Sequence, residues 1–380
     1  MLTDNNHPRT PPMRTLAPLL LALVACAAPP SAGWRPLFNG HDLSGWSQVN
    51  CAPSTFTARD GLIVCTGKPT GVLRTDRMYE NFILELEYRH LQPGGNAGLF
   101  VWSDPLPSRG VPFTRSLEVQ VMDGVETADY TSHGDIFSIW GASFVPDRPH
   151  PAGWERCLPS ERRARPAPEW NHYRVTCRDG VIELEVNGAR VSGGTQASPR
   201  KGYLCLESEG SEVHFRNLRI RKLPGAPALA GRDGAAQAES LRTLYTGIDL
   251  SGWQAAGGGA PDATHWQARD WVLWTDGQGG SLRGPDLPGD FVVQLDWKRA
   301  EDGPVAWPFH VGLNLPLVPD ASVAGWHRAR IALDGDRLVL DVDGRRAFEG
   351  GPVRRSAPTR LELRPGDLAT EYANLFLGEP

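Results

Sequence analysis

The sequence predicts an all-β protein built from two β-sandwiches in tandem, the second of them reduced. Short segments alternate apolar and polar residues, and 42 Gly and 33 Pro separate them, which is typical of many strands joined by turns. Several of these segments recur in the same order in the two halves of the chain. Short strands with one apolar face favour two packed sheets, and we find no long amphipathic helical pattern.

Composition limits the class of protein and its partners. A chain of 380 residues allows two or three domains, and a hydrophobic content of 40% can fill their cores. The charge is mixed, with a formal net value of -5. A nucleic-acid partner would need a basic face, so we expect none.

The N-terminus is predicted to be an export signal. Arg14 precedes an apolar stretch from Leu16 to Ala25, which is too short to span a bilayer as a mature helix. The stretch ends in "LVAC" (23–26), which resembles the bacterial lipoprotein signal, in which the cysteine is lipidated. We therefore expect residues 1–33 to be a signal segment and Cys26 to carry a lipid. Ordinary signal cleavage into the periplasm is the alternative, and membrane contact is expected through the lipid only.

Five matches relate the two halves of the chain. They define a first repeat at 34–223, a small-residue linker at 224–240 and a second repeat at 241–380. The matches pair "LFNGHDLSGW" (37–46) with "LYTGIDLSGW" (244–253), "FTARDGLIV" (56–64) with "WQARDWVLW" (266–274), "NFILELEYR" (81–89) with "DFVVQLDWK" (290–298), "EWNHYRVTCRDGVIELEVNG" (169–188) with "GWHRARIALDGDRLVLDVDG" (325–344), and "YLCLESEGSEVHFRNLRI" (203–220) with "RLELRPGDLATEYANLFL" (360–377).

Turns and a bulge are predicted at particular residues. Asn187-Gly188 follows the alternating run "VIELEV" and provides the positive φ angles of a tight hairpin turn. Asp343-Gly344 stands at the same place in the second repeat. In "EVHFRNLRI" the apolar alternation changes phase, and a bulge near Arg216-Asn217 would reconcile its two ends.

Export makes disulfide bonds chemically accessible. Cys51 and Cys65 flank a short segment and form one candidate pair. Cys177 and Cys205 lie in two strand-like segments and form another, which leaves Cys157 single. Buried unpaired thiols are the alternative, because sequence does not fix connectivity.

The motifs "LFNGHDLSGW", "NAGLFVW", "LEVQVMD", "EWNHYRV" and "LCLESEG…FRNLRI" together resemble the 3-keto-disaccharide hydrolase domain family. The resemblance covers nearly all of the first repeat, whereas the second repeat keeps only the opening motif and the closing strands. It implies a concanavalin-like jelly-roll sandwich with a concave, sugar-binding face. It also implies cleavage of glycosides that are already oxidised at C3.

One segment distinguishes the repeats and marks a candidate site. Between "GLFVW" and "EWNHYRV" the first repeat carries about 70 residues, whereas the second carries about 10 at the same place. A strand needed only for packing should survive duplication, so we interpret "SLEVQVMDG" (116–124) as part of a site. Glu118 is the first candidate for a base or metal ligand, and Gln120 and Asp123 for sugar contacts. A solvated polar strand face is the alternative.

Other candidates lie near this segment or in the closing motif. "SHGD" supplies His133 and Asp135 as catalytic residues or metal ligands, although a loop histidine can also cap backbone groups. "ESEG" supplies Glu207 and Glu209, which either complete an acid/base set or belong to a solvated turn. Stacking on a sugar ring is a candidate role for three tryptophans, Trp102, Trp140 and Trp154, although tryptophan in a sandwich is often core.

Two functions from different classes follow. The first is an exported enzyme that cleaves 3-keto-glycosides by β-elimination and hydration or by direct hydrolysis. The ketone acidifies the hydrogen on C2, so the site needs a base, an acid for the leaving oxygen and a group that stabilises the enolate, a role open to a divalent cation. The second is a noncatalytic, lectin-like carbohydrate-binding module, because one fold hosts both functions.

Overall fold

The computed structural model describes residues 33–124, 134–225, 234–300, 307–313, 315, 325–353 and 359–380. These residues form antiparallel strands joined by turns and contain no helix. The segments of the chain described here accordingly include no helix of the length and hydropathy needed to cross a membrane. Residues 1–32, which include Cys26, lie outside the described residues, as does His133.

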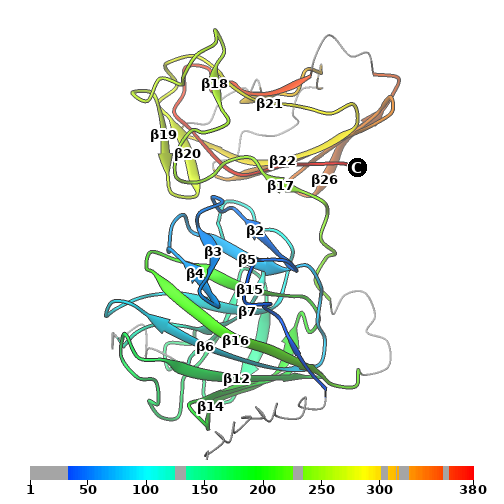
Figure 1. Ribbon diagram of the computed structural model, residues 1–380. Coiled ribbons are helices and arrows are strands. Elements are labelled where there is room, and N and C mark those ends of the chain that lie inside the picture. The colour runs from blue at the N-terminus through cyan, green and yellow to red at the C-terminus, as the bar shows by residue number, and fades with distance from the viewer. Residues whose placement is uncertain are drawn as a thin grey trace, which may run out of the picture. The chain divides into compact units, whose positions relative to one another are not determined.

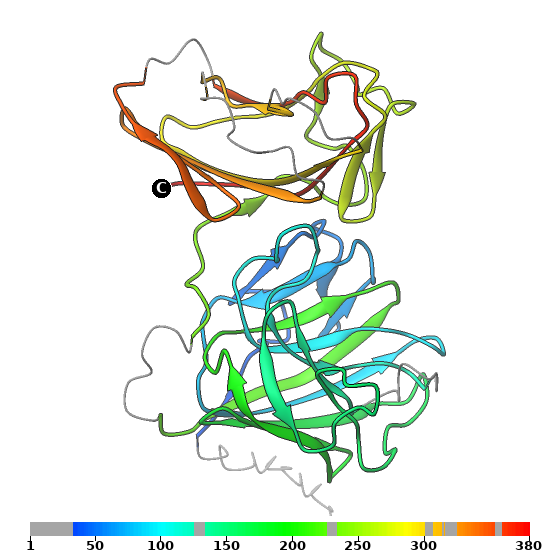
Figure 2. The same cartoon turned by 180° about the vertical axis from the view of Figure 1, so that it is seen from behind.

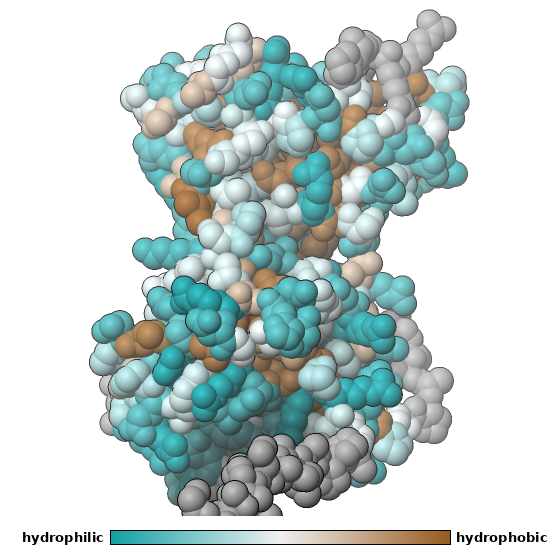
Figure 3. Space-filling model, viewed as in Figure 1, coloured by the Kyte–Doolittle hydropathy of each residue, from teal (hydrophilic) through white to brown (hydrophobic). Residues whose placement is uncertain are grey.

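The first sandwich contains strands β1 to β16, and its larger sheet has nine of them (Figure 1). Its outward face is rich in charged side chains such as Glu87 and Arg216, and the molecular surface there is largely hydrophilic (Figure 3). In spatial order the strands are β10 (Ser143–Pro146), β14 (Ala189–Ser198), β13 (Val181–Val186), β12 (Asn171–Arg178), β6 (Phe82–His90), β16 (Val213–Lys222), β4 (Leu62–Cys65) and β3 (Phe56–Arg59), and β1 (Trp34–Pro36) also pairs with β16.

The second sheet of the first sandwich has seven strands. It can be followed in Figure 2, which views the molecule from behind. Its inward face packs against the nine-stranded sheet around one apolar cluster that includes Leu117, Val119 and Leu206. In spatial order the strands are β11 (Arg156–Cys157), β9 (Ile136–Ile139), β8 (Ser116–Gln120), β7 (Gly98–Ser103), β15 (Tyr203–Ser208), β5 (Gly71–Thr75) and β2 (Trp46–Val49).

The second sandwich has its own core around Trp266, Trp297 and Tyr372. Its larger sheet contains β19 (Trp266–Arg269), β20 (Val272–Thr275), β28 (Thr370–Gly378), β22 (Phe291–Arg299), β24 (His327–Asp334), β25 (Arg337–Val342) and β26 (Arg345–Gly350), with β17 (Arg242–Thr243) beside β28. Its smaller sheet contains β18 (Gln254–Ala255), β21 (Leu282–Asp286), β27 (Arg360–Leu363) and β23 (Phe309–His310).

The comparison of the two smaller sheets confirms that the second sandwich is reduced. The order β18-β21-β27-β23 repeats the order β2-β5-β15-β7 of the first sandwich. Among the described residues, nothing in the second sandwich corresponds to β8, β9 and β11. The all-β, tandem jelly-roll prediction is therefore confirmed, and the strand that carries Glu118 belongs to the first copy.

The predicted turns and bulge are also confirmed. Asn187 and Asp343 have φ angles of 48° and 51° and are each followed by a glycine with positive φ, as a tight hairpin turn requires. The pairing of β16 with β6 shifts register between Arg216 and Arg219. Asn217 has a φ of 55° within that shift, so one extra residue lets both halves of β16 bury their apolar side chains.

The predicted disulfide pairs are wrong, because Cys51, Cys65, Cys177 and Cys205 are free and buried thiols. Cys177 on β12 faces the core between the sheets. Cys205 lies on β15 of the other sheet and packs with a different cluster on its opposite face, so the two residues are not cross-strand neighbours. Cys51 donates its thiol hydrogen to the carbonyl oxygen of Val49 (3.3 Å) instead of pairing.

Candidate active site

The outward face of the seven-stranded sheet carries the polar side chains of "SLEVQ". Because side chains alternate along a strand, Leu117 and Val119 enter the core, and Glu118 and Gln120 point to the opposite face. Val119 is fully buried, whereas Glu118 is half-buried. Together with Glu207 from β15, these two polar residues line one pocket, so Glu118 lies in a pocket and not on an open strand face, and its role in a functional site stays a prediction.

Gly98 creates the space in which two carboxyl groups meet. It lies on β7 between β8 and β15 and is paired with Gln120. A Cβ atom on Gly98 would lie 2.7 Å from Oε1 of Glu118 and 2.8 Å from Oε2 of Glu207. The two side chains therefore lean over the glycine from opposite sides, and any other residue at position 98 would displace them.

A chain of amide hydrogen bonds orients the third carboxyl group, that of Glu209. Nε2 of Gln120 donates to Oδ1 of Asn96 (2.7 Å), and Nδ2 of Asn96 donates to Oε2 of Glu209 (2.5 Å). The backbone of Asn96 is itself held by Oγ of Ser211 (2.9 Å). Gln120, Asn96 and Glu209 therefore form one hydrogen-bonded set in the same pocket as Glu118 and Glu207.

Burial raises the pKa of all three carboxyl groups, and neighbouring carboxylates raise the pKa of Glu118 and Glu207 further. The pKa of Glu118 rises to about 8, first because burial disfavours its charge and then because Glu209 and Asp135 are negative. Burial and the neighbouring Glu118 and Glu209 raise the pKa of Glu207 well above its usual value. Burial also raises the pKa of Glu209. Like charges in low dielectric cannot all ionise, so this cluster retains protons near neutral pH.

Apolar side chains, most of them aromatic, form the rest of the pocket wall. Phe113, Phe137, Ile139 and Trp140 line it, and its volume is about 170 Å3. Trp140 is 49% exposed and stacks on Phe113, with ring centroids 6.5 Å apart and planes inclined by 13°. Flat apolar faces beside polar groups suit the two sides of a sugar ring or a planar group.

Asp135 is buried beside the pocket and forms an ion pair with Arg156. Nε of Arg156 donates to Oδ2 of Asp135 (2.5 Å), and its guanidinium lies over the ring of Phe137, 4.7 Å from the centroid. Asp135 is not among the residues that line the pocket. Asp135 therefore stabilises the structure around β9 through this ion pair, in contrast to the predicted catalytic role.

Asp123 also differs from its predicted role in substrate binding. It is 5% exposed, and its carboxylate accepts hydrogen bonds from the backbone N–H groups of Gly94 and Ala167, both at 3.0 Å. It does not line the pocket. A buried carboxylate that accepts hydrogen bonds from backbone N–H groups stabilises the loops that carry those groups. Without the carboxylate, the N–H groups would be buried with no hydrogen-bond partner.

The three candidate tryptophans have separate positions. Trp102 is fully buried in the core, and its Nε1 donates to the carbonyl oxygen of Glu80 (2.8 Å), so the stacking role is wrong for it. Trp154 is exposed and stacks on His150 away from the pocket lining. Only Trp140 borders the carboxyl cluster.

The metal prediction depends partly on His133, which lies outside the described residues. Within the described ranges, no group of three or more His, Cys, Asp or Glu side chains is placed to hold a metal ion.

Sequence reasoning missed Asn96, Gly98 and Phe113. The first two lie in the motif "NAGLFVW", and a glycine inside an otherwise apolar strand is a signal of close approach by another group. That signal identifies Gly98, but only the pairing of β7 with β8 and β15 shows which groups approach it. Phe113 lies in a loop of irregular sequence and carries no comparable signal.

Comparisons with known proteins agree with this architecture. Residues 33–221 match the model of the 3-keto-alpha-glucoside-1,2-lyase-like domain. A search of curated proteins finds no match.

Solved structures similar to the chain come from several bacteria. A glycosyl hydrolase candidate from Parabacteroides distasonis is 23% identical, with a TM-score of 0.40, over 50% of this chain and 94% of that one. The carbohydrate-binding module CBM66 from Bacillus subtilis is 12% identical, with a TM-score of 0.35, over 47% of this chain and 96% of that one. LamAcat from Zobellia galactanivorans is 9% identical, with a TM-score of 0.33, over 47% of this chain and 90% of that one.

The family match covers every strand of the seven-stranded sheet and all three carboxyl residues of the pocket. Residues 33–221 of the chain therefore belong to the 3-keto-alpha-glucoside-1,2-lyase-like domain family.

Proposed function

We propose that the protein is an exported enzyme that cleaves glycosides carrying a ketone at C3, and that the pocket above Gly98 is its active site. The observation that carries the proposal is the meeting of Glu118 and Glu207 over Gly98. Glu209 lies in the same pocket and is hydrogen-bonded to Asn96. Three carboxyl groups that share protons near neutral pH provide an acid and a base side by side. The family membership of residues 33–221 supports the choice of substrate.

The first step is a β-elimination across C1 and C2 of the sugar. Ionised Glu118 removes the hydrogen on C2, which the neighbouring ketone acidifies, and the electron pair of that bond forms the enolate. A carboxyl group whose pKa is about 8 is a stronger base than an ordinary glutamate, and a pKa near the working pH suits proton transfer. The second amide hydrogen of Gln120 Nε2 is a donor for the enolate oxygen.

The second step releases the group on C1. The enolate collapses to an enone as the C1–O bond breaks, and protonated Glu207 gives its proton to the departing oxygen. Water then adds its oxygen to C1 of the enone and gives one proton to the Glu207 carboxylate, while Glu118 returns a proton to C2. The net reaction is hydrolysis, and both carboxyl groups end as they began.

A time course in deuterated water tests this proposal. The full chain is incubated with a 3-keto-glycoside, and release of the aglycone is followed together with deuterium at C2 of the released sugar. Elimination and hydration place solvent deuterium at C2, whereas direct hydrolysis leaves C2 unlabelled. A parallel arm with a chelator reveals any metal requirement. Saturable binding of an unoxidised disaccharide without turnover of the keto-glycoside would instead favour the lectin-like function.

Anchoring is proposed separately from catalysis. The sequence "LVAC" that ends at Cys26 supports a lipidated, membrane-held protein whose substrate is met outside the cytoplasm. Lipid labelling of the protein in its host is the direct measurement.

A further inference from the structure

The wall of the pocket is formed in part by the loop that joins β7 to β8. This loop, residues 104–115, carries Phe113 into the pocket lining. The backbone N–H of Ser108 donates to the carbonyl oxygen of Phe113 (2.8 Å), and Arg115 and Asp104 form a two-point ion pair at its base (2.9 and 3.0 Å). The loop is therefore a small hairpin with Phe113 on one arm and residues 108–111 at its tip.

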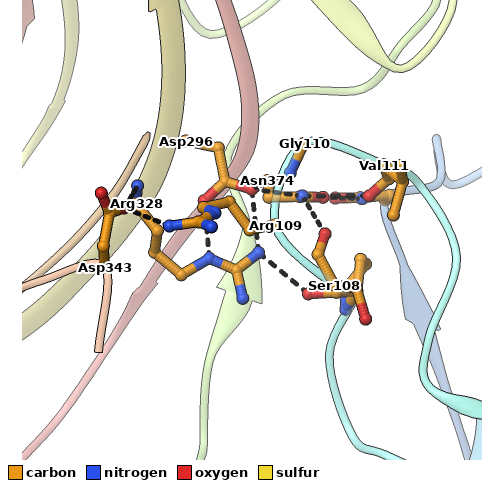
Figure 4. Close-up of polar contacts among 10 residues, drawn as sticks. Ser108, Arg109, Gly110, Val111, Asp296, Arg328, Asp343 and Asn374 are labelled. Carbon is orange, nitrogen blue, oxygen red and sulfur yellow. Dashed lines mark hydrogen bonds and ion pairs between the residues drawn. The ribbon is translucent and has the colours of Figure 1, made fainter. Parts of the chain in front are cut away.

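Residues of the second sandwich bind the tip of this loop (Figure 4). Nδ2 of Asn374 donates to the carbonyl oxygens of Ser108 and Val111, both at 3.1 Å, and the backbone N–H of Gly110 donates to Oδ2 of Asp296 (2.8 Å). Asn374 and Asp296 are buried, at 1% and 0% exposure. Buried polar groups that satisfy a loop backbone fix its position, because separating them costs their full desolvation.

A charged pair completes the same contact. Arg328 donates from Nη2 to Oδ2 of Asp296 (2.8 Å) and to the carbonyl oxygen of Pro107 (2.9 Å). A more exposed ion pair joins Arg109 to Asp343 (2.7 Å), and such exposed pairs contribute little. The buried hydrogen bonds around Asp296 therefore contribute most to fixing the position of the loop.

The duplication shows that this contact belongs to the second copy alone. In the aligned repeats, Asp296 and Asn374 stand where Glu87 and Asn217 stand in the first copy. Asn217 is exposed, and Glu87 and Asn217 border an open pocket of about 480 Å3. The same sheet face is therefore open in the first sandwich and forms a docking surface in the second.

Apolar contacts reach the pocket wall from the same direction. Phe376 on β28 joins Phe100 and Tyr203 of the seven-stranded sheet in one buried cluster. Phe113 and Ile139, both of which line the pocket, pack against that cluster. The second sandwich thus touches the wall through polar groups at the loop tip and through an apolar cluster behind it.

We propose that the second sandwich is a positioning element for the active site, which holds the 104–115 loop so that Phe113 and Trp140 form a fixed wall for the substrate. This inference rests on the proposed function for its kinetic readout. It assigns the second copy a structural part in the first copy's site, in place of an independent sugar site. The residues concerned do not touch the reacting atoms, so a change in them should alter substrate binding and leave the proton-transfer groups unchanged.

Gly110→Ala tests the proposal, with Gly61→Ala as a matched control. The two glycines have nearly the same positive φ, 72° and 74°, so alanine suffers similar backbone strain at both positions. A Cβ at position 110 would lie 2.3 Å from Cγ of Trp326, whereas a Cβ at position 61 meets nothing within 4 Å. Only the first substitution therefore forces the loop away from the second sandwich.

Three measurements on the full chain separate the outcomes. For Gly110→Ala we expect faster amide exchange in residues 108–114 and a KM for the 3-keto-glycoside raised roughly 10- to 100-fold, since small misplacements have effects of that size. The shape of the pH profile of kcat should remain that of the unchanged protein, and Gly61→Ala should show none of these changes.

Asn374→Ala provides a second route to the same test, since it removes both hydrogen bonds to the loop tip without touching the loop. Normal loop exchange and normal KM in a folded variant of either kind would overturn the proposal, as would equal effects from Gly61→Ala. If the unchanged protein does not turn over the 3-keto-glycoside, the proposed function fails. The exchange measurement still decides in that case whether the second sandwich positions the loop.

Discussion

Glu118→Gln should abolish most activity while making the protein more stable at alkaline pH. Glutamine keeps the volume and most of the hydrogen-bonding reach of glutamate but neither ionises nor accepts a proton in this range. General acid–base catalysis contributes roughly 10²- to 10⁴-fold, so turnover should fall by that factor. The effect on stability has the opposite sign because the native fold disfavours the Glu118 carboxylate.

The pKa of Glu118 determines the pH range of the stability effect. Below about pH 4.5 the side chain is protonated in both the folded and the unfolded protein, and the substitution changes little. Between pH 4.5 and about 8 the folded state holds a proton that the unfolded state has lost, so the free energy of unfolding of the unchanged protein falls as pH rises. Above pH 8 the side chain is ionised in both states, and the loss in the free energy of unfolding has reached its full value.

The size of this loss in the free energy of unfolding follows from the rise in the pKa of Glu118. A rise from 4.5 to about 8 corresponds to roughly 5 kcal/mol as an upper limit, because Glu118 shares protons with Glu207 and Glu209. In a domain of this size each 1 kcal/mol moves Tm by about 2–4 °C. Glu118→Gln should therefore melt several degrees above the unchanged protein at pH 8.5 and at nearly the same temperature at pH 4.5.

Thermal melts at the two pH values and the rate of 3-keto-glycoside turnover check this prediction together. Glu169→Gln, at an exposed position of the first sandwich, serves as the control for a neutralised carboxylate. Near-normal turnover by Glu118→Gln would refute the catalytic role. A variant that melts lower than the unchanged protein at pH 8.5 would refute the electrostatic reasoning.

Other substitutions test separate parts of the argument. Gly98→Ala should reduce turnover more than about 10²-fold, since its Cβ would separate Glu118 from Glu207; a fully active variant would contradict the site geometry. Asp135→Ala should lower the free energy of unfolding by about 3–5 kcal/mol because it breaks the buried ion pair with Arg156, and chemical denaturation measures this. Cys26→Ser should remove lipid labelling in the host, and unchanged labelling would exclude lipidation at that residue.

Part of the site could be read from the sequence because a strand has a period of two residues. The alternation in "SLEVQ" fixed which side chains share a face, and the absence of this segment from the second repeat marked that face as functional. Turn residues such as Asn187-Gly188 and the bulge at Asn217 were equally accessible, because the positive φ angles they adopt favour a few residue types. These are local properties of the chain.

The partners of each side chain were decided only by the tertiary structure. Asp123 and Asp135 are carboxylates in the same stretch as Glu118, yet one bonds backbone donors and the other pairs with Arg156. Nothing in their local sequence distinguishes them, because the groups that approach come from distant strands and loops.

The all-β class, the recurring segments and the strand that carries Glu118 could be predicted from the sequence, since they depend on patterns within short segments and on their recurrence. Only the folded chain shows that Glu118 meets Glu207 over Gly98, that the five cysteines within the described residues are unpaired, and that the second sandwich binds the loop beside the pocket. The physical reason is that pKa values, hydrogen-bond partners and close approaches arise between residues far apart in the chain. The strand order, which places β7 between β8 and β15, determines which of these distant residues meet.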